Sequence, residues 1–299
     1  MANAVSQQNS DHQLRRLAAQ RRLYVTAKRW HALDLTLAVV APPAWSLIAN
    51  QLASSKPYAA LWGITAGLFS SILITLRINQ LRESAARVQE EFDCNAFELE
   101  WDEIVVGDHP HSELITQEAR RSNSATTAAT LRDWYPTVVY RLPITAARLV
   151  CQRANAWWDR QLRRRYTGLM ITIAVVVCLV VFALGIAGHA TLEDFVLTVV
   201  APLTPTVLFA TRYVRENHAA GQRVEHVQRA LETAWNAVLN HTLTDADAAR
   251  LSRRVQSALF NHRKNAPLVF GTVYRLLRTR QEYEMQFNAE HLAQEYEDA

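Results

Sequence analysis

The chain has 299 residues, of which 49% are apolar and 20% charged, and its mean hydropathy is −0.09. Glycine (8), proline (9) and cysteine (3) are scarce and aromatic residues make up 9%, which excludes collagen-like, disulfide-rich and wholly disordered proteins. The 32 basic and 28 acidic residues give a formal net charge of +4. Taken alone, this charge indicates a weak attraction to anionic partners.

Residues 1–32 are predicted to form a basic amphipathic arm, with Asn9 or Ser10 placed to cap its helix. About 30 mostly polar residues precede the first long apolar run, so we expect no cleavable signal peptide. The apolar residues on one side of the arm are Leu14, Leu17, Ala18 and Tyr24.

Four windows are almost free of charge and have the length of about 20 residues that crosses a hydrocarbon core as a helix. Helices buried in a soluble core are usually shorter and keep a polar face. The sequence therefore predicts four transmembrane helices. They are Leu33–Ala53, Tyr58–Leu76, Thr167–Ala187 and Leu192–Thr211.

Only short linkers separate the members of each pair, so the four segments form two predicted hairpins, at 33–76 and 167–211. Of the 32 Lys and Arg residues, only Lys56 lies in these linkers. The positive-inside rule then places both termini, the middle segment 77–166 and the tail 212–299 in the cytoplasm. The predicted fold class is mostly α: a polytopic membrane protein with four transmembrane helices in two hairpins and a helical cytoplasmic domain.

Helical periodicity continues into the cytoplasmic segments, where two amphipathic stalks extend the second and fourth membrane helices. We expect their apolar stripes to pack on the chain's own core, with coiled-coil-like self-association as the alternative. The stripes are Ile78, Leu81, Ala85, Val88 and Phe92, and Val224, Val227, Leu231, Ala234, Trp235 and Val238. Further helices are predicted at Ile144–Tyr166, Asp245–His262 and Pro267–Glu297, and a short extended piece at Thr137–Tyr140.

The second membrane segment carries a small residue at every fourth position, which predicts a face for close helix packing. These residues are Ala59, Gly63, Gly67 and Ser71. No ionisable residue lies near the middle of any membrane segment, which argues against a proton-coupled transporter or an ion pump.

The common enzyme signatures are absent from the sequence: there is no P-loop, dinucleotide-binding glycine motif, nucleophile elbow or zinc-protease motif. His109, His111 and Glu113 have no evident further ligand, so we expect no metal site there. The acidic run from Glu90 to Glu103 is expected to be solvated or paired with arginines. We therefore expect a protein that is not an enzyme and that needs no cofactor.

Arginine is unusually frequent, accounting for 29 of the 32 basic residues, and many arginines lie beside aromatic residues. A guanidinium grips phosphate through two hydrogen bonds, and Trp and Tyr rings stack on bases, so this mixture suits a nucleotide ligand. Arginines near a membrane also bind lipid headgroups or pair with acidic neighbours, and this alternative stays open for each of them. The candidate ligand-binding residues are Trp134, Tyr135, Arg141, Arg148, Arg153, Trp157, Arg163, Arg164, Arg253, Arg254 and Arg275.

Several short motifs carry a resemblance to a known family. They are Leu17-Ala18-Ala19-Gln20-Arg21 with Tyr24 and Lys28, Asn79-Gln80, Gln89-Glu90-Glu91-Phe92-Asp93-Cys94, Leu99-x-Trp101, Trp134-Tyr135-Pro136, Cys151-Gln152-Arg153-x-Asn155, Trp158-Asp159, Leu162 and Arg163-Arg164-Arg165-Tyr166. With the two-hairpin layout, they span nearly the whole chain. The chain resembles the SMODS-associating four-transmembrane effectors of cyclic-oligonucleotide-based anti-phage signalling (CBASS).

The resemblance implies a pore-forming effector of the bacterial inner membrane that is functionally linked to a cyclic-oligonucleotide synthase. A cyclic di- or trinucleotide made on infection would act as its activating ligand and trigger membrane damage that ends in abortive infection. The resemblance implies no set of ligand-contacting residues, so the candidates above rest on the sequence reasoning alone.

The leading hypothesis is therefore a membrane effector gated by a cyclic oligonucleotide. We expect it to contact membrane lipids and to bind no DNA or RNA polymer. Because four apolar helices are too narrow to enclose an aqueous channel, we expect a homo-oligomer. The alternatives are a membrane scaffold or lipid sensor whose arginines bind anionic lipids, and a membrane enzyme with an unrecognised site near Asp93–His111.

Overall fold

The structure is a computed structural model that describes residues 3–37, 65, 69–122, 129–187, 196 and 201–299. These residues are mostly α-helical and contain no strand, which confirms the predicted mostly-α class. In chain order the elements are η1 (Ala4–Asn9), α1 (Asp11–Leu35), η4 (Ser70–Ile74), α4 (Thr75–Phe97), α5 (Glu103–Val106), α6 (Ser112–Arg121), η5 (Thr137–Arg141), α8 (Ile144–Ala187), α10 (Ala201–Leu239), α11 (Asp245–Asn265) and α12 (Gly271–Asp298).

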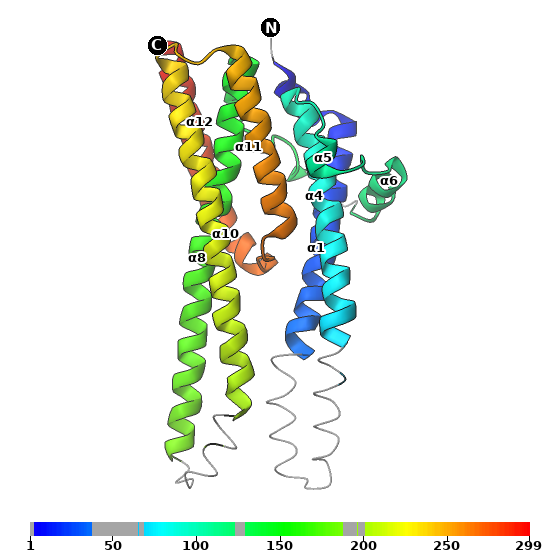
Figure 1. Cartoon of the computed structure of the whole chain (residues 1–299), viewed down its shortest axis with the longest axis vertical. Coiled ribbons are helices and arrows are strands. Elements are labelled where there is room, and N and C mark those ends of the chain that lie inside the picture. Colours follow the sequence, from blue (N-terminus) through cyan, green and yellow to red (C-terminus); the bar gives the residue numbers. More distant parts are fainter. Residues whose placement is uncertain (1–2, 38–64, 66–68, 123–128, 188–195, 197–200) are drawn as a thin grey trace.

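Two long antiparallel helical pairs form the frame of the molecule (Figure 1). The first pair is α1 with α4, and the second pair is α8 with α10. All four helices extend toward the end of the molecule that lies opposite both chain termini. α11 lies between the pairs and contacts α4, α8 and α10, while α12 packs on α8 and α6 packs on α1.

The predicted apolar stripes on α4 and α10 are confirmed as core positions. All five stripe residues of α4, from Ile78 to Phe92, are buried. On α10, Val224, Leu231, Ala234 and Trp235 are buried and the other two stripe residues are partly buried against the same core. Because most helical stability in proteins comes from burying such a face, these stripes account for the length of both helices.

Helix ends follow local signals in several places. Ser10 is the N-cap residue of α1, and Thr244 caps α11 by accepting a hydrogen bond from the Asp247 N–H at 3.2 Å. The first turn of α11 is acidic and its last turn holds His262, Arg263 and Lys264, so both ends favour the helix dipole. The predicted helix at 144–166 is also confirmed, since it forms the first half of α8.

The prediction of an extended piece at Thr137–Tyr140 is wrong, because these residues belong to the 3₁₀ helix η5. The β-branched residues favour an extended chain only as long as no tertiary contact decides otherwise. Here the Asn3 amide donates to the carbonyls of Val139 and Leu142, at 2.7 and 2.8 Å, while Val139 is fully buried. These contacts favour the tight turn over a strand.

Over the residues that the structure describes, no helix is long and apolar enough to pass through a bilayer. The predicted segment 167–187 lies in α8, whereas the other three predicted segments fall partly outside the described residues. Ala59, Gly63 and Gly67 of the predicted packing face lie outside them too, as does the side chain of Ser71. The four-span topology therefore stays a prediction.

Four apolar clusters divide the described interior, and the smallest joins Ala86, Val106 and Phe260. The largest joins α4, α8, α10, α11 and α12 at the end of the molecule near the termini. A second cluster holds the first pair together, and a third holds the second pair together. The two pairs thus share a core at one end and have separate cores closer to the other.

Candidate functional site

A network of buried polar side chains joins α4 to α11. Glu90 and Asp93 are both 0% exposed, one helical turn apart on α4. Arg253 Nη2 donates to Glu90 at 2.6 Å, and Arg263 Nη1 donates to Asp93 at 2.6 Å. The Gln256 amide lies between them and donates to both carboxylates, at 2.9 and 2.8 Å. Each buried carboxylate therefore has a charged partner, which is what makes its burial tolerable.

The same network continues from α11 and α4 to α8. Gln152 on α8 exchanges hydrogen bonds with Ser252, at 2.9 and 3.0 Å. The Tyr135 hydroxyl donates to Asp93 at 2.6 Å and accepts from the Asn155 amide at 2.9 Å. Side chains from three helices and one loop are thereby fixed to a single pair of carboxylates.

The ionisation of these groups follows from their surroundings. Burial, and then the neighbouring Asp93 carboxylate, raise the pKa of Glu90. Burial alone would lower the pKa of Arg263, but Asp93, Tyr135 and Glu90 together outweigh it and raise this pKa. Burial also raises the pKa of Cys94 to about 12, so this thiol stays protonated and unreactive at neutral pH.

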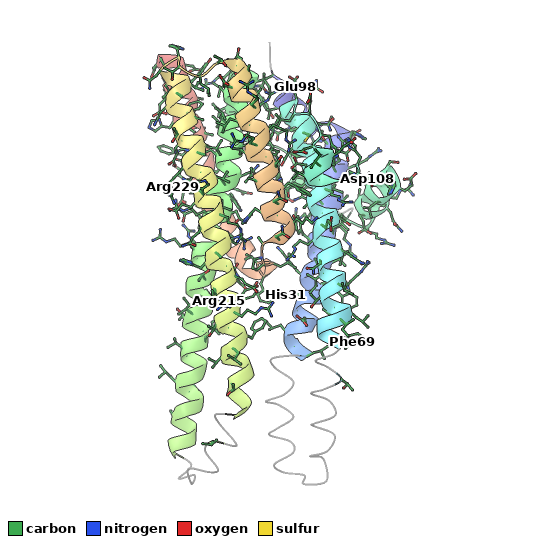
Figure 2. The ribbon with its side chains drawn as sticks, viewed as in Figure 1. His31, Phe69, Glu98, Asp108, Arg215 and Arg229 are labelled. Atoms are coloured by element: carbon green, nitrogen blue, oxygen red, sulfur yellow. The ribbon has the colours of Figure 1, made fainter. Side chains whose placement is uncertain are left out.

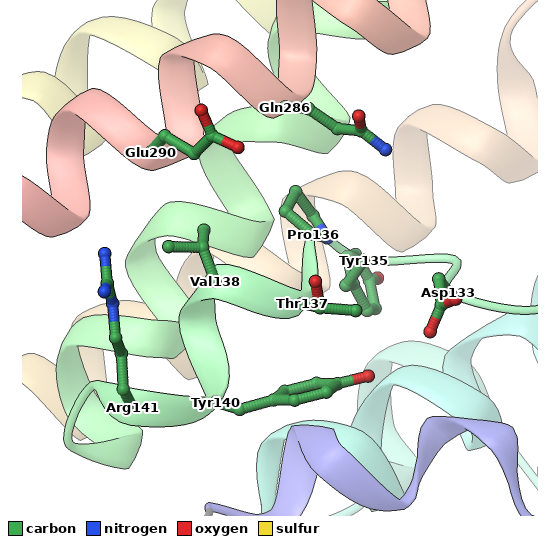
Figure 3. A pocket seen from close by; sticks show the side chains of 9 residues that line it. All are labelled: Asp133, Tyr135, Pro136, Thr137, Val138, Tyr140, Arg141, Gln286 and Glu290. Atoms are coloured by element: carbon green, nitrogen blue, oxygen red, sulfur yellow. The ribbon is translucent and has the colours of Figure 1, made fainter.

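A second site is an open pocket between η5 and α12 with a volume of about 520 Å³. Gln286 and Glu290 face it from α12, while Tyr140 and Arg141 line the other side (Figure 3). Arg141 also forms an ion pair with Glu297 at 3.0 Å. The pocket thus offers an aromatic ring, a guanidinium, an amide and a carboxylate to a ligand.

The predicted ligand-binding residues are not gathered in one place. Tyr135 and Arg141 line the pocket, while Trp134 is partly buried against the large core. Trp157 is half-buried, and the Arg164 and Arg254 side chains are exposed. The side chain of Arg275 lies outside the described residues.

The remaining candidate arginines are engaged within the chain. Arg148 donates to the carbonyls of Phe97 and Glu98, where α4 ends with Glu98 in the left-handed conformation. Arg153 lies 3.7 Å from Glu232, and Arg253 belongs to the buried network. Arg163 donates to Asp159 at 2.6 Å and to Asn217 at 2.9 Å. No contact in the structure tests any of these residues as a ligand contact, so the list stays a prediction.

The expectation for the acidic run is confirmed at three positions in its arginine-paired form, since Glu90, Glu91 and Asp93 bind arginines. Glu90 and Asp93 are buried rather than solvated. Sequence reasoning missed Gln152, Ser252 and Gln256. The available signal was polar residues at helical spacing within an apolar face, as for Ser252 and Gln256 beside Val255 and Leu259 on α11.

A family model for the SMODS-associating 4TM effector domain matches residues 2–292. The chain belongs to the SMODS-associating 4TM effector family. The resemblance noted in the sequence is therefore confirmed. A relative from Bacillus cereus strain VD146, named a probable CBASS effector molecule, is 20% identical over 262 residues, which cover 86% of each chain. No solved structure matches the chain.

Some of the residues that carried this family resemblance belong to the buried network. They are Glu90, Asp93, Tyr135, Gln152 and Asn155. Part of the family motifs of this chain therefore contributes to the contacts between its two helical pairs.

Acid is expected to weaken the contacts of α11. Asp159 accepts from His262 at 2.7 Å, and Glu83 accepts from Lys264 at 2.9 Å. Burial alone would raise the pKa of Asp159, but the charges of Arg163 and His262 hold it well below 3.8. The hydrogen bond from Lys264 lowers the pKa of Glu83. The stabilisation from both groups is complete above their ordinary pKa values and is lost as the pH falls below about 4.

Urea denaturation at several pH values checks this expectation. Asp159→Asn should lower the free energy of unfolding by about 1–3 kcal/mol at pH 7, and the difference from the unmodified protein should shrink at pH 3. Glu225→Gln is the control, because Glu225 forms a half-exposed ion pair with Arg160 at 3.1 Å. Its free energy of unfolding should differ little from that of the unmodified protein at either pH. An Asp159→Asn difference that stays constant from pH 7 to pH 3 would contradict the assignment.

Proposed function

We propose that the chain is a membrane effector of CBASS anti-phage defence. A cyclic oligonucleotide binds to its cytoplasmic part, and the chain then permeabilises the bacterial inner membrane, which stops phage replication by killing or arresting the cell. Family membership and the name of the Bacillus relative support the defence role. The gating ligand and the membrane damage are the parts that need experimental tests.

The observation that carries the proposal is the distance between the pocket and the apolar ends of the helical pairs. The pocket lies near both termini, since Arg141 pairs with Glu297 and Asn3 bonds to Val139. The four long helices extend to the opposite end (Figure 1). There α8 exposes a series of apolar side chains, as expected of a surface that meets lipid. They are Leu169, Ile171, Ile173, Val175, Val176, Leu179 and Val180.

The chemistry of the pocket suits a nucleotide. The Arg141 guanidinium can grip a phosphate, and binding would replace its present partner Glu297. The Tyr140 ring offers a surface on which a base can stack, and the Gln286 amide and Glu290 carboxylate can bond to a base edge. Because the four apolar helices of one chain are too narrow to enclose a channel, several copies are needed to surround one, so we propose a homo-oligomer.

A thermal-shift screen of cyclic di- and trinucleotides on the full-length protein in detergent tests the ligand. One of these nucleotides should raise the unfolding temperature, and Arg141→Ala should weaken its binding at least tenfold, which corresponds to about 1.4 kcal/mol. Arg250→Ala, which changes an exposed arginine on α11 that is not a candidate ligand-binding residue, is the control and should bind as before.

Two other outcomes would redirect the proposal. Loss of binding in Arg153→Ala and Arg164→Ala, with Arg141→Ala unaffected, would place the ligand along α8 instead of in the pocket. Binding that depends on anionic lipid and ignores every nucleotide would favour the scaffold or lipid-sensor alternative.

A further inference from the structure

Residues His262–Phe270, which we name the tie, run from the last turn of α11 to the start of α12. They lie between the two helical pairs, about midway along the molecule (Figure 1). Most of these residues contact one pair or the other, and both pairs are contacted. No sequence motif predicted this role, since the predicted helices Asp245–His262 and Pro267–Glu297 leave only residues 263–266 between them.

The last turn of α11 is bound to both pairs through three successive side chains. His262 contacts Asp159 of α8 at 2.7 Å. Arg263 pairs with Asp93 of α4 at 2.6 Å, and Lys264 pairs with Glu83 of α4 at 2.9 Å. Through these three contacts the last turn of α11 connects the first pair with the second.

The backbone that follows is held by both pairs as well. The carbonyl of Ala266 accepts from Arg82 of α4 at 3.2 Å, and that of Pro267 accepts from Arg163 of α8 at 3.1 Å. The carbonyl of Leu268 accepts from the Tyr213 hydroxyl of α10. Side-chain donors thus replace helical hydrogen bonds here, which explains why α12 begins at Gly271, four residues later than predicted.

The apolar side chains of the tie are divided in the same way. Leu268 is buried in the cluster of the first pair, whereas the adjacent Val269 is buried in the cluster of the second pair. The Phe270 ring stacks on His31 of α1, with 5.4 Å between ring centroids, and lies against Tyr166 of α8 at 6.3 Å. His31 lies between the two pairs (Figure 2) and also stacks on Tyr213.

We propose that the tie is a latch that holds the two helical pairs together, and that its release lets them separate. α12 follows the tie directly and carries Gln286 and Glu290 of the pocket, so a ligand that draws these residues toward η5 pulls on the tie. The latch itself depends only on the contacts above, whereas its release by a nucleotide rests on the proposed function. In that sequence of events, nucleotide binding in the pocket near the termini releases the tie, and the two helical pairs then rearrange at the opposite end of the molecule.

The latch can be tested by measuring the distance between the pairs. Spin labels at Arg29→Cys on α1 and Arg215→Cys on α10, two exposed positions, report it in full-length protein with Cys178→Ala, since Cys94 and Cys151 are buried. Tyr213→Phe with Arg82→Met removes two of the donors to the tie. We expect the distance distribution to broaden and move to longer values without any nucleotide.

A matched control removes equivalent contacts within α10 alone. Thr233→Val deletes a hydroxyl that bonds to the Arg229 carbonyl, and Arg212→Met deletes a pair with Glu216. This control should keep the unmodified distribution. Phe270→Leu, which keeps an apolar residue but removes the ring stack, should shift the distribution in the same direction and serves if the double variant does not fold.

An unchanged distribution in folded Tyr213→Phe/Arg82→Met protein and in Phe270→Leu would overturn the latch. Dye release from liposomes that contain these variants separates the two proposals. Separated pairs without dye release would support the latch and count against the membrane function, whereas nucleotide-dependent release from pairs that stay together would overturn the latch alone.

Discussion

Replacing Asp93 with Ala should lower the free energy of unfolding by about 3–5 kcal/mol, because it leaves the guanidinium of Arg263 buried without its carboxylate. The same change removes acceptors from the Tyr135 hydroxyl and the Gln256 amide. Denaturation of the purified protein, followed by its tryptophan fluorescence, measures the loss.

Two further variants separate the cost of an unpaired charge from the value of the ion pair. Asp93→Leu combined with Arg263→Met should recover most of the lost stability, because buried ion pairs are often replaced by apolar residues at little cost. Glu232→Ala removes a more exposed ion pair, in which Glu232 lies 3.7 Å from Arg153. This change should lower the free energy of unfolding by at most about 1 kcal/mol. A loss no larger than this for Asp93→Ala would show that the network does not join the pairs.

Tyr135→Phe should lower the free energy of unfolding by about 1–3 kcal/mol, because Asp93 loses a buried donor and Asn155 a buried acceptor. Tyr135→Ala should cost about 3–5 kcal/mol, since it also removes a ring that packs against Phe92 and Phe97. Tyr135 is only 1% exposed.

The same pair of variants tests the idea that Tyr135 stacks on a base of the ligand. If the Tyr135 ring served only to stack on a base, Phe would serve equally well, and the stability of the protein would not change. Full stability of both variants, with nucleotide binding kept in Tyr135→Phe and lost in Tyr135→Ala, would therefore contradict the structural role and restore the ligand role. Combining Tyr135→Phe with Asp93→Ala should give less than the sum of the two losses, because both remove the same hydrogen bond.

Periodic patterns predicted the parts of this fold that depend on one helix at a time. The apolar stripes of α4 and α10 recur at three- and four-residue spacing because each helix buries one face. Ile78 and Val88 on α4 and Leu231 on α10 are buried members of these stripes. The same reasoning failed for Thr137–Tyr140, where a contact from Asn3, more than 130 positions away in the chain, decides the conformation.

The ion pairs between α4 and α11 could not be predicted from periodicity, because the paired residues are far apart in sequence. Glu90 and Arg253 are 163 positions apart, and Asp93 and Arg263 are 170 apart. The acidic run predicted that some arginine would bind it, but nothing in the spacing selects Arg253 or Arg263 over Arg254. The pocket could not be predicted for the same reason, since η5 and α12 meet only in the folded chain.

Arginine content alone does not locate a ligand site. Arg148 bonds to the end of α4, and Arg163 bonds to Asp159, Asn217 and the Pro267 carbonyl. A guanidinium has five donors, so it satisfies several buried acceptors as readily as it grips a phosphate. Frequency and aromatic neighbours do not distinguish these two uses, whereas the contacts of each side chain do.

Dye release from liposomes is the most direct test of the account. Full-length protein in vesicles of phosphatidylethanolamine and phosphatidylglycerol should retain the dye until the nucleotide found in the thermal-shift screen is added. It should then release the dye, and Arg141→Ala should need at least tenfold more nucleotide for the same release. Release that occurs equally without nucleotide, or no release at any concentration of a nucleotide that binds, would contradict a ligand-gated membrane effector.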